Sequence, residues 1–390
     1  MPQFGDHRPF AACGQRNRHH RQALQSVQSR HAERAAQGLE RRRHADALDG
    51  RFLQAHGRGQ VSPQRDLVGV ALEQICDDGH RQSAGWKGDV QGEFAAILGV
   101  KDERELLPHC MAHLARIGVD RVAAIDCGST DGSLEWLQAR AGDRLRLVRY
   151  DDRDPDAAAW ERLNLQLARE SGAQWVVFLD ADEFWIPAGG SLRACAGLAD
   201  ADVLRVHRFN VPVGTDGPCF GQEGPPGDPD DLSLIVEPVP DFRARLREEP
   251  ELPWIRGVPV PKVMVRTERL DGLHDGGHEV RAGAGAPLRR RVPTDLLIAH
   301  LPFTTEARFE RKLANIRRVF EVHDAYFGEH LAWHWRRWLD LPDAGAVRGE
   351  FRRQAFDDAT LANLRSQDAV MTASAWFARQ SLRQAASDVA

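Results

Sequence analysis

The 390-residue chain lacks several features that mark particular classes of protein. No stretch approaches the roughly 18 consecutive apolar residues that span a membrane, and charged residues stand near the start, where a secretory signal has an apolar core. The net charge of −5 provides no basic field that would attract nucleic acid. We therefore expect a cytoplasmic protein without a transmembrane segment and without nucleic acid as its partner.

Cysteine is also scarce. The cysteines lie far apart, and no two of them form a CxxC pair. This spacing argues against a disulfide framework and against a structural zinc site, so we expect reduced thiols in a reducing compartment. The six positions are Cys13, Cys76, Cys110, Cys127, Cys195 and Cys219.

The composition changes near residue 93. Residues 1–92 are rich in Arg, Gln and His, with 7 of the 16 histidines, and show few apolar periods. This composition predicts a poorly ordered extension, and a His-rich metal-binding tail is the alternative. We expect the folded part to consist of an α/β domain over 93–304 and a helical region over 305–390.

The α/β domain is predicted from strands that alternate with helices. Apolar runs of strand length alternate with segments of helical periodicity and polar caps, and they are joined by short loops. This order indicates a doubly wound, mostly parallel sheet that binds its ligand at the carboxyl ends of the strands. The predicted strands are 94–100, 121–126, 144–150 and 174–180, then 261–266 and 294–303; helices are predicted over 102–118, 130–140, 154–172 and from Thr305.

Acidic residues cluster where three of these strands end. The sequence QWVVFLDADEFWIP (174–187) runs from an apolar strand directly into Asp180, Asp182 and Glu183. Two carboxylates at this spacing can hold one hard divalent cation that also binds phosphate oxygens. Asp126, at the end of another strand, is suited to accept hydrogen bonds from a base N–H or a ribose hydroxyl. A lone DxD can also be a helix cap, but three acidic strand ends together favour a ligand site.

These motifs carry a resemblance. The segments VKDERELLPHCMAHLARIGVDRVAAIDCGSTDGSLEWL and WVVFLDADEFW resemble the nucleotide-binding half of family-2-type glycosyltransferases with the GT-A fold. The resemblance covers residues 95–186. It implies transfer of a sugar from a nucleotide-sugar donor with Mn²⁺ or Mg²⁺ as cofactor. In the implied donor site, Lys101, Glu103, Asp126 and Asp180 bind the donor, with Asp126 near the base, and Asp180 and Asp182 bind the metal and the diphosphate.

Two positions depart from the family pattern. Asp102 stands where the pattern has Asn, and Cys127 stands where many members have a second Asp. These departures leave the base of the nucleotide donor undecided, and UDP is the usual guess for the nucleotide. The acceptor is equally open and could be a carbohydrate, a lipid-linked compound or a protein.

The catalytic base is expected after residue 186. An inverting transferase needs a carboxylate or an imidazole to take the proton of the acceptor hydroxyl. The glycine-rich segment LHDGGHEV offers Asp275, His278 and Glu279, of which we favour His278 and then Asp275. The alternative is a solvated turn.

Three further features each have two interpretations. His300 could reach the metal or a phosphate, or it could be an ordinary polar group at a strand end. Lys262 and Arg266 could balance the charge of the diphosphate or lie on a solvated strand face. The Trp-rich segment 331–340 could bind an acceptor or contact a membrane peripherally, although packing onto the domain is the expectation that we favour.

Other functional classes fit less well. A phosphatase of the haloacid dehalogenase type also has an apolar strand that ends in DxD, but there the motif opens the domain and is not followed by Glu-Phe. A nucleotidyltransferase would need a glycine-rich, basic loop after the first strand, and LGVKDE has a single glycine. The alternatives that we keep are the nucleotidyltransferase on a related fold and a non-catalytic sugar-binding relative.

Overall fold

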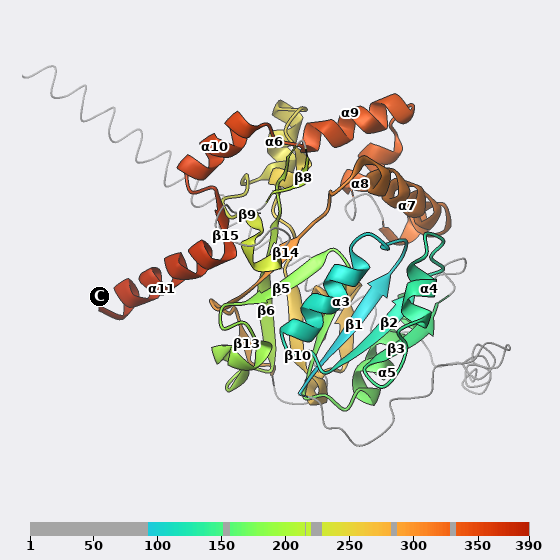
Figure 1. Cartoon of the computed structure of the whole chain (residues 1–390), viewed down its shortest axis with the longest axis vertical. Coiled ribbons are helices and arrows are strands. Elements are labelled where there is room, and N and C mark those ends of the chain that lie inside the picture. The colour runs from blue at the N-terminus through green and yellow to red at the C-terminus, as the bar shows by residue number, and fades with distance from the viewer. Residues whose placement is uncertain are drawn as a thin grey trace, which may run out of the picture. The chain divides into compact units, whose positions relative to one another are not determined.

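Figure 1 shows the computed structural model of the chain. The structure describes residues 93–150, 157–214, 216–219, 228–281, 287–327 and 333–389. The extension predicted over 1–92 therefore lies outside the described residues. Within the described ranges, no helix has the length and apolar character needed to cross a membrane.

Four parallel strands form the first half of the central sheet. β1 and β4 are buried along almost their whole length, which explains why continuous apolar runs predicted them. Each of the four predicted strands is confirmed to within one residue at either end. In their spatial order β3-β2-β1-β4, the strands are β3 (Leu145–Arg149), β2 (Arg121–Asp126), β1 (Phe94–Val100) and β4 (Trp175–Asp180).

Helices cover both faces of this half of the sheet. Leu107 and Leu114 of α3 pack with Leu98 in one core, whereas Leu165 of α5 packs with Ile97 in the core on the opposite face. Successive residues of β1 point to opposite faces, so one strand serves both cores. The doubly wound α/β prediction is confirmed. The helices are α3 (Leu107–Arg116), α4 (Ser133–Gln138) and α5 (Ala157–Glu170).

Two predicted helices begin later than their polar caps suggested. Asp102 has a φ of 55° and Gly132 has a φ of 95°, and neither value is compatible with a right-handed helix. Both residues are thereby excluded from helices, and α3 starts at Leu107 and α4 at Ser133. The residues before each helix form loops at the carboxyl ends of β1 and β2.

The second half of the sheet is mixed. Beyond β4 the spatial order continues β10-β6-β14-β5, with β10 and β5 antiparallel to their neighbours. The predictions of β10 and β14 are confirmed, whereas β5 and β6 were not predicted because regular alternation of strands and helices ends near residue 186. These strands are β10 (Lys262–Arg266), β6 (Val203–Asn210), β14 (Leu296–His300) and β5 (Glu183–Pro187).

The short link between β4 and β5 forces this half to curl. The link consists of Ala181 and Asp182, so the chain can advance only about 11 Å from Asp180 to Glu183. Four strand spacings across a flat sheet would need about 19 Å. The curl occurs along β6, which pairs with β10 through its first half and with β14 through its second half. As a result, His300 at the end of β14 lies opposite Glu183.

The C-terminal part of the described chain is mainly helical, as predicted, and it builds a third core. Phe309 of α7 packs there with Phe303, Trp338 and Phe351. Figure 1 shows α7, α8 and α9 beyond the ends of the parallel strands. The helices are α7 (Glu306–Phe327), α8 (Trp333–Leu339), α9 (Ala344–Gln354), α10 (Asp358–Ser366) and α11 (Ala373–Val389), and β15 (Val370–Thr372) pairs with β9 (Ser233–Ile235).

We predict that Gly277→Ala destabilises the protein by about 2 to 4 kcal/mol. Gly277 has a φ of 74°, and a Cβ placed there would overlap the Cβ of Phe178 in β4. Urea unfolding would measure the loss. Gly349→Ala in α9 is the control, because a Cβ there meets nothing within 4 Å and should stabilise the helix by about 0.5 to 1 kcal/mol. Equal stabilities of the two variants would contradict the prediction.

Candidate active site

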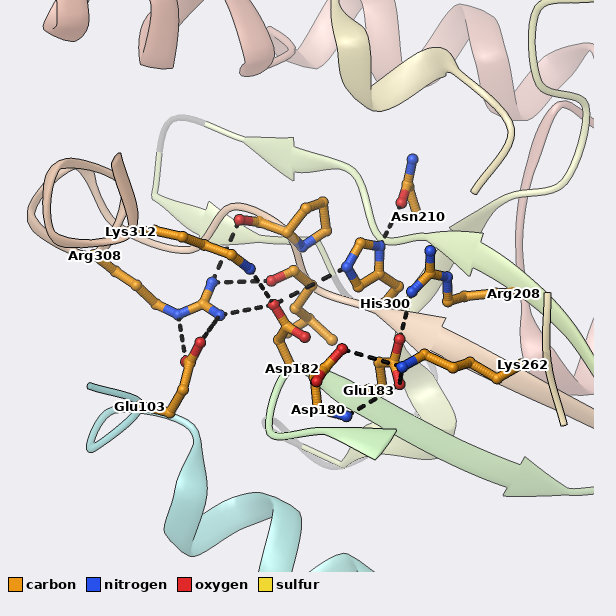
Figure 2. A network of polar contacts seen from close by, with 12 residues as sticks. Glu103, Asp180, Asp182, Glu183, Arg208, Asn210, Lys262, His300, Arg308 and Lys312 are labelled. Carbon is orange, nitrogen blue, oxygen red and sulfur yellow. Dashed lines mark hydrogen bonds and ion pairs between the residues drawn. The ribbon is translucent and has the colours of Figure 1, made fainter. Parts of the chain in front are cut away.

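Charged side chains from distant parts of the chain meet at the carboxyl ends of β1, β4 and β14, where the sequence predicted a ligand site. Figure 2 shows them as one polar network. Four of the side chains are acidic and four are basic, and one histidine belongs to the same network. They are Glu103, Asp180, Asp182 and Glu183; Arg208, Lys262, Arg308 and Lys312; and His300.

Asp182 is held by two cations of α7. Its Oδ2 accepts hydrogen bonds from Arg308 at 2.9 Å and from Lys312 at 2.6 Å. Arg308 also donates to both carboxylate oxygens of Glu103, at 2.9 and 3.0 Å. Burial by itself would raise the pKa of Asp182, but Lys312 and Arg308 hold it well below its usual range. A carboxylate that is 2% exposed is thus kept ionised by its partners.

Glu183 has its own pair of cations. Its fully buried carboxylate contacts Arg208 and lies 3.3 Å from Lys262. Lys262 also donates to Asp180 at 3.1 Å and to the carbonyl of Gly276 at 2.6 Å. Burial alone would lower the pKa of Lys262, but the carboxylates of Asp180 and Glu183 raise it. Asp180 differs from Asp182 and Glu183, because 57% of its side chain is exposed to solvent.

The hydrogen bonds around His300 define its tautomer. Asn210 donates its amide N–H groups to the carbonyls of Ile255 and Gly257, so its Oδ1 must be the acceptor at 2.8 Å from Nδ1 of His300. Nδ1 therefore carries the proton, and Nε2 presents its lone pair. Nε2 lies 4.0 Å from Oδ2 of Asp182. Burial lowers the pKa of His300 well below its usual range, so the ring is neutral.

Asp182 and His300 supply two donor atoms of the kinds that bind divalent cations, on an oxygen that Lys312 holds in this structure. A carboxylate oxygen and an imidazole lone pair face each other, and the second ring nitrogen of His300 is anchored by Asn210, as in protein metal sites. A nitrogen ligand suits Mn²⁺ better than Mg²⁺. Among the described residues, no group of three or more His, Cys, Asp or Glu is placed to hold a metal. Water and substrate oxygens would therefore have to complete the coordination.

Lys101 and Asp126 organise the loop after β2. The ammonium of Lys101 donates to the carbonyls of Cys127 at 2.6 Å and of Gly128 at 2.8 Å. The buried carboxylate of Asp126 accepts the backbone N–H groups of Gly128 and Ser129. Both side chains thus lie at the predicted edge of the sheet, where they bond to the backbone of this loop.

Asp102 connects the same region to α7. Its φ of 55° lies in the left-handed region, which Asp and Asn tolerate better than most other residues. Its carboxylate accepts the backbone N–H of Thr130 at 2.6 Å and the side-chain amide of Asn315 at 2.8 Å. Burial would raise the pKa of Asp102, but these hydrogen bonds lower it.

The two residues favoured as catalytic base lie beside the network. Nδ1 of His278 lies 2.9 Å from the carbonyl oxygen of Pro261. A carbonyl oxygen can only accept a hydrogen bond, so Nδ1 carries the proton and donates. Burial and the nearby Lys262 lower the pKa of His278 to about 4. Asp275 starts the 3-10 turn Asp275–Gly277, and its side chain lies outside the described part of the structure.

The structure distinguishes between the two interpretations given for His300, for the basic residues of β10 and for the Trp-rich segment. His300 and Lys262 belong to the network, and Lys262 is 1% exposed, so it does not lie on a solvated face. Arg266, at the other end of β10, instead donates to the carbonyls of Ala201 and Leu198. Trp338 is 1% exposed and packs in the third core, as the packing interpretation expected.

Sequence reasoning missed the contribution of α7 to the site. The apolar stripe of this helix was predicted, but a polar residue also directly precedes each of its first three apolar residues. Helical spacing puts the three polar residues on one face, where they contact Asp182, Glu103 and Asp102. That spacing was the available signal. The polar residues are Arg308, Lys312 and Asn315, and the apolar ones are Phe309, Leu313, Ile316 and Phe320.

A cavity of about 530 Å³ adjoins this region of the chain. Its lining includes Phe184 and Leu301, which are the sequence neighbours of Glu183 and His300. Three carboxylates also line it, from Glu105, Asp216 and Glu306, and its lining residues include neither Lys nor Arg. The cavity is therefore suited to a neutral or cationic group rather than to an anion.

The chain was compared with known proteins. No protein-family model and no curated protein sequence matches it. Among solved structures, similarity is found to S. aureus TarS 1-349, at 14% identity over 66% of this chain and 70% of that one, with a TM-score of 0.29. The mannosyltransferase PcManGT from Pyrobaculum calidifontis, in complex with GDP-Man and Mn²⁺, shares 18% identity over 78% and 86% of the two chains, with a TM-score of 0.30.

A third similar structure is glucosyl-3-phosphoglycerate synthase from Mycobacterium tuberculosis, in complex with Mn²⁺, UDP-glucose and glycerol 3-phosphate. It shares 17% identity over 63% of this chain and 84% of that one, with a TM-score of 0.28. Any function assigned to the present chain therefore depends on its own motifs and on the geometry of its site.

We predict that the protein loses stability as the pH falls from about 6.5 to 5.5. Burial, and to a smaller extent the positive charge of Lys312, lowers the pKa of His334 to about 3. Burial also lowers the pKa of His300. The unfolded chain binds protons at these histidines near pH 6.5, whereas the folded chain does not. Each such histidine should lower the free energy of unfolding by about 1 kcal/mol over this pH interval.

Urea unfolding at the two pH values measures the effect. His334 stacks on Trp254, so His334→Phe keeps an aromatic ring at this position and removes the titrating group. The variant should lose about 1 kcal/mol less than the wild type over the same interval. An unchanged pH dependence in His334→Phe would contradict the assignment.

Proposed function

We propose that the chain is a glycosyltransferase that takes its sugar from a nucleoside diphosphate donor and binds a divalent cation, Mn²⁺ or Mg²⁺, at Asp182 and His300, with Asp180 beside them. The observation that carries the proposal is the pair of electron donors, His300 Nε2 and Asp182 Oδ2, which face each other 4.0 Å apart at the strand ends where the DxD motif lies. A UDP-sugar is the donor that we test first.

The metal would supply one chemical contribution, which is to neutralise charge on the diphosphate as it leaves the sugar. The chain's own residues orient the reactants. Asp180, whose carboxylate is 57% exposed and accepts one hydrogen bond from Lys262, can meet a ligand while the buried pairs of Asp182 and Glu183 persist. Lys101 and Asp126 fix the loop after β2, which we propose contacts the nucleoside.

The metal and nucleotide should stabilise the protein together. We predict that thermal-shift measurements with UDP or GDP show a clear rise in melting temperature only when Mn²⁺ is present, because ligands that bind the folded state stabilise it. Asp182→Asn and His300→Gln each remove one ligand of the pair. Both should abolish the shift and lower donor turnover by about 100-fold or more.

Asp200→Asn is the control for these variants. Asp200 pairs with Arg291 outside the network, so this variant removes an ion-paired carboxylate without touching the proposed site. This variant should behave as the wild type. If nucleotide diphosphates with Mn²⁺ give no shift in the wild type, the transferase proposal loses its support; binding without turnover would favour the non-catalytic sugar-binding relative.

We further propose His278 as the group that takes the proton of the acceptor hydroxyl. Its Nδ1 proton is engaged with Pro261, so Nε2 carries a lone pair that can accept a proton. His278→Gln should retain nucleotide binding by thermal shift and lose transfer by about 100-fold. Transfer at the wild-type rate would exclude this role and leave Asp275 as the next candidate.

A further inference from the structure

Lys312 occupies the oxygen that the metal would need. Its ammonium lies 2.6 Å from Oδ2 of Asp182, which is also the atom that faces His300 at 4.0 Å. A cation bound to this oxygen would lie about 2 Å from it, within close range of the ammonium. Two positive charges at this separation repel each other strongly in a site with little water. The metal and the ammonium of Lys312 cannot both hold this oxygen in the present geometry.

Arg308, the other cation on Asp182, is fixed in place. It is 2% exposed, and its guanidinium donates to both oxygens of Glu103 and to the carbonyl of Leu301 at 3.1 Å in addition to Asp182. Moving Arg308 would leave several buried polar groups without partners, which is costly. Arg308 is therefore the cation on Asp182 that is costlier to move.

Lys312 is free to move by comparison. Its side chain is 25% exposed, and the hydrogen bond recorded for its ammonium among the described residues is the one to Asp182. The ammonium also lies 5.9 Å from the ring centre of Trp335, within the range of a cation–π contact. A flexible four-carbon stem, partial exposure and a nearby aromatic face together allow the ammonium to leave Asp182.

We propose that Lys312 is a displaceable counter-cation that holds Asp182 until metal and donor bind, and then turns its ammonium to the phosphates of the donor. This inference rests on the proposed function. It explains how a buried carboxylate that serves as a metal ligand stays compensated when the metal is absent. It also makes metal uptake depend on the nucleotide, because the displaced ammonium gains an anionic partner only when a diphosphate is bound.

The test measures Mn²⁺ binding directly, by the electron paramagnetic resonance signal of free Mn²⁺ during titration of the full chain. In the absence of nucleotide, Lys312→Met should bind Mn²⁺ about tenfold more tightly than the wild type, because it keeps the stem and removes the competing charge. Lys312→Arg keeps the charge and should bind Mn²⁺ as weakly as the wild type. Arg317→Met is the control: Arg317 lies on an exposed part of α7 and donates to the carbonyl of Leu339.

The titrations are then repeated with saturating UDP or GDP. The nucleotide should raise the Mn²⁺ affinity of the wild type by a larger factor than that of Lys312→Met, because the variant has no ammonium to transfer to the phosphates. Circular dichroism spectra of all variants verify folding. If Lys312→Met misfolds, Lys312→Gln replaces it in both titrations.

The outcomes separate the two proposals. Equal Mn²⁺ affinities in the wild type and Lys312→Met, with UDP- or GDP-dependent Mn²⁺ binding intact, would overturn the role of Lys312 and leave the proposed function standing. Absence of Mn²⁺ binding in every protein, with and without nucleotide, would overturn the metal seat itself and the role of Lys312 with it.

Discussion

The buried ion pair between Asp182 and Arg308 is the interaction on which the site depends. A carboxylate that is 2% exposed must be compensated, and its partners come from a helix more than a hundred residues later in the chain. Removing one partner of such a pair costs roughly 3 to 5 kcal/mol, because the other charge is then left buried. Arg308 also binds Glu103, so one guanidinium joins the loop after β1, the end of β4 and α7. The site therefore takes this geometry only when α7 is docked against the strand ends.

Backbone connectivity imposes a second constraint. The link between β4 and β5 is too short to cross a flat sheet, and the resulting curl pairs His300 with Glu183. This pairing, together with the hydrogen bond from the backbone N–H of Leu301 to the carbonyl of Asp182, fixes the imidazole beside the carboxylate without any direct bond between the two side chains. Asn210 then sets the tautomer of His300 from a third strand. Main-chain pairing thus positions Asp182 and His300 side by side, and the hydrogen bond from Asn210 sets which nitrogen of His300 is protonated.

The charges of the network are balanced as they stand. Four carboxylates face four cationic side chains, so neither an anion nor a metal cation alone is attracted by a net charge. A diphosphate and a divalent cation that arrive together largely preserve this balance. Asp180 and Lys312 are the more exposed members, at 57% and 25%, and they are the groups that can exchange partners while the buried pairs persist.

The sequence by itself determined the strands of the parallel half and the existence of the helices between them, because apolar runs and helical periodicity are local properties. It also placed Asp126 and Asp180 at strand ends, with Asp182 two residues beyond Asp180. Only the tertiary structure decided which groups surround those acids. Arg308 and Lys312 reach Asp182 through helix docking, and His300 reaches it through the curl of the sheet. Such contacts depend on the closure of long loops and on pairing register, which leave no local trace in the order of the residues.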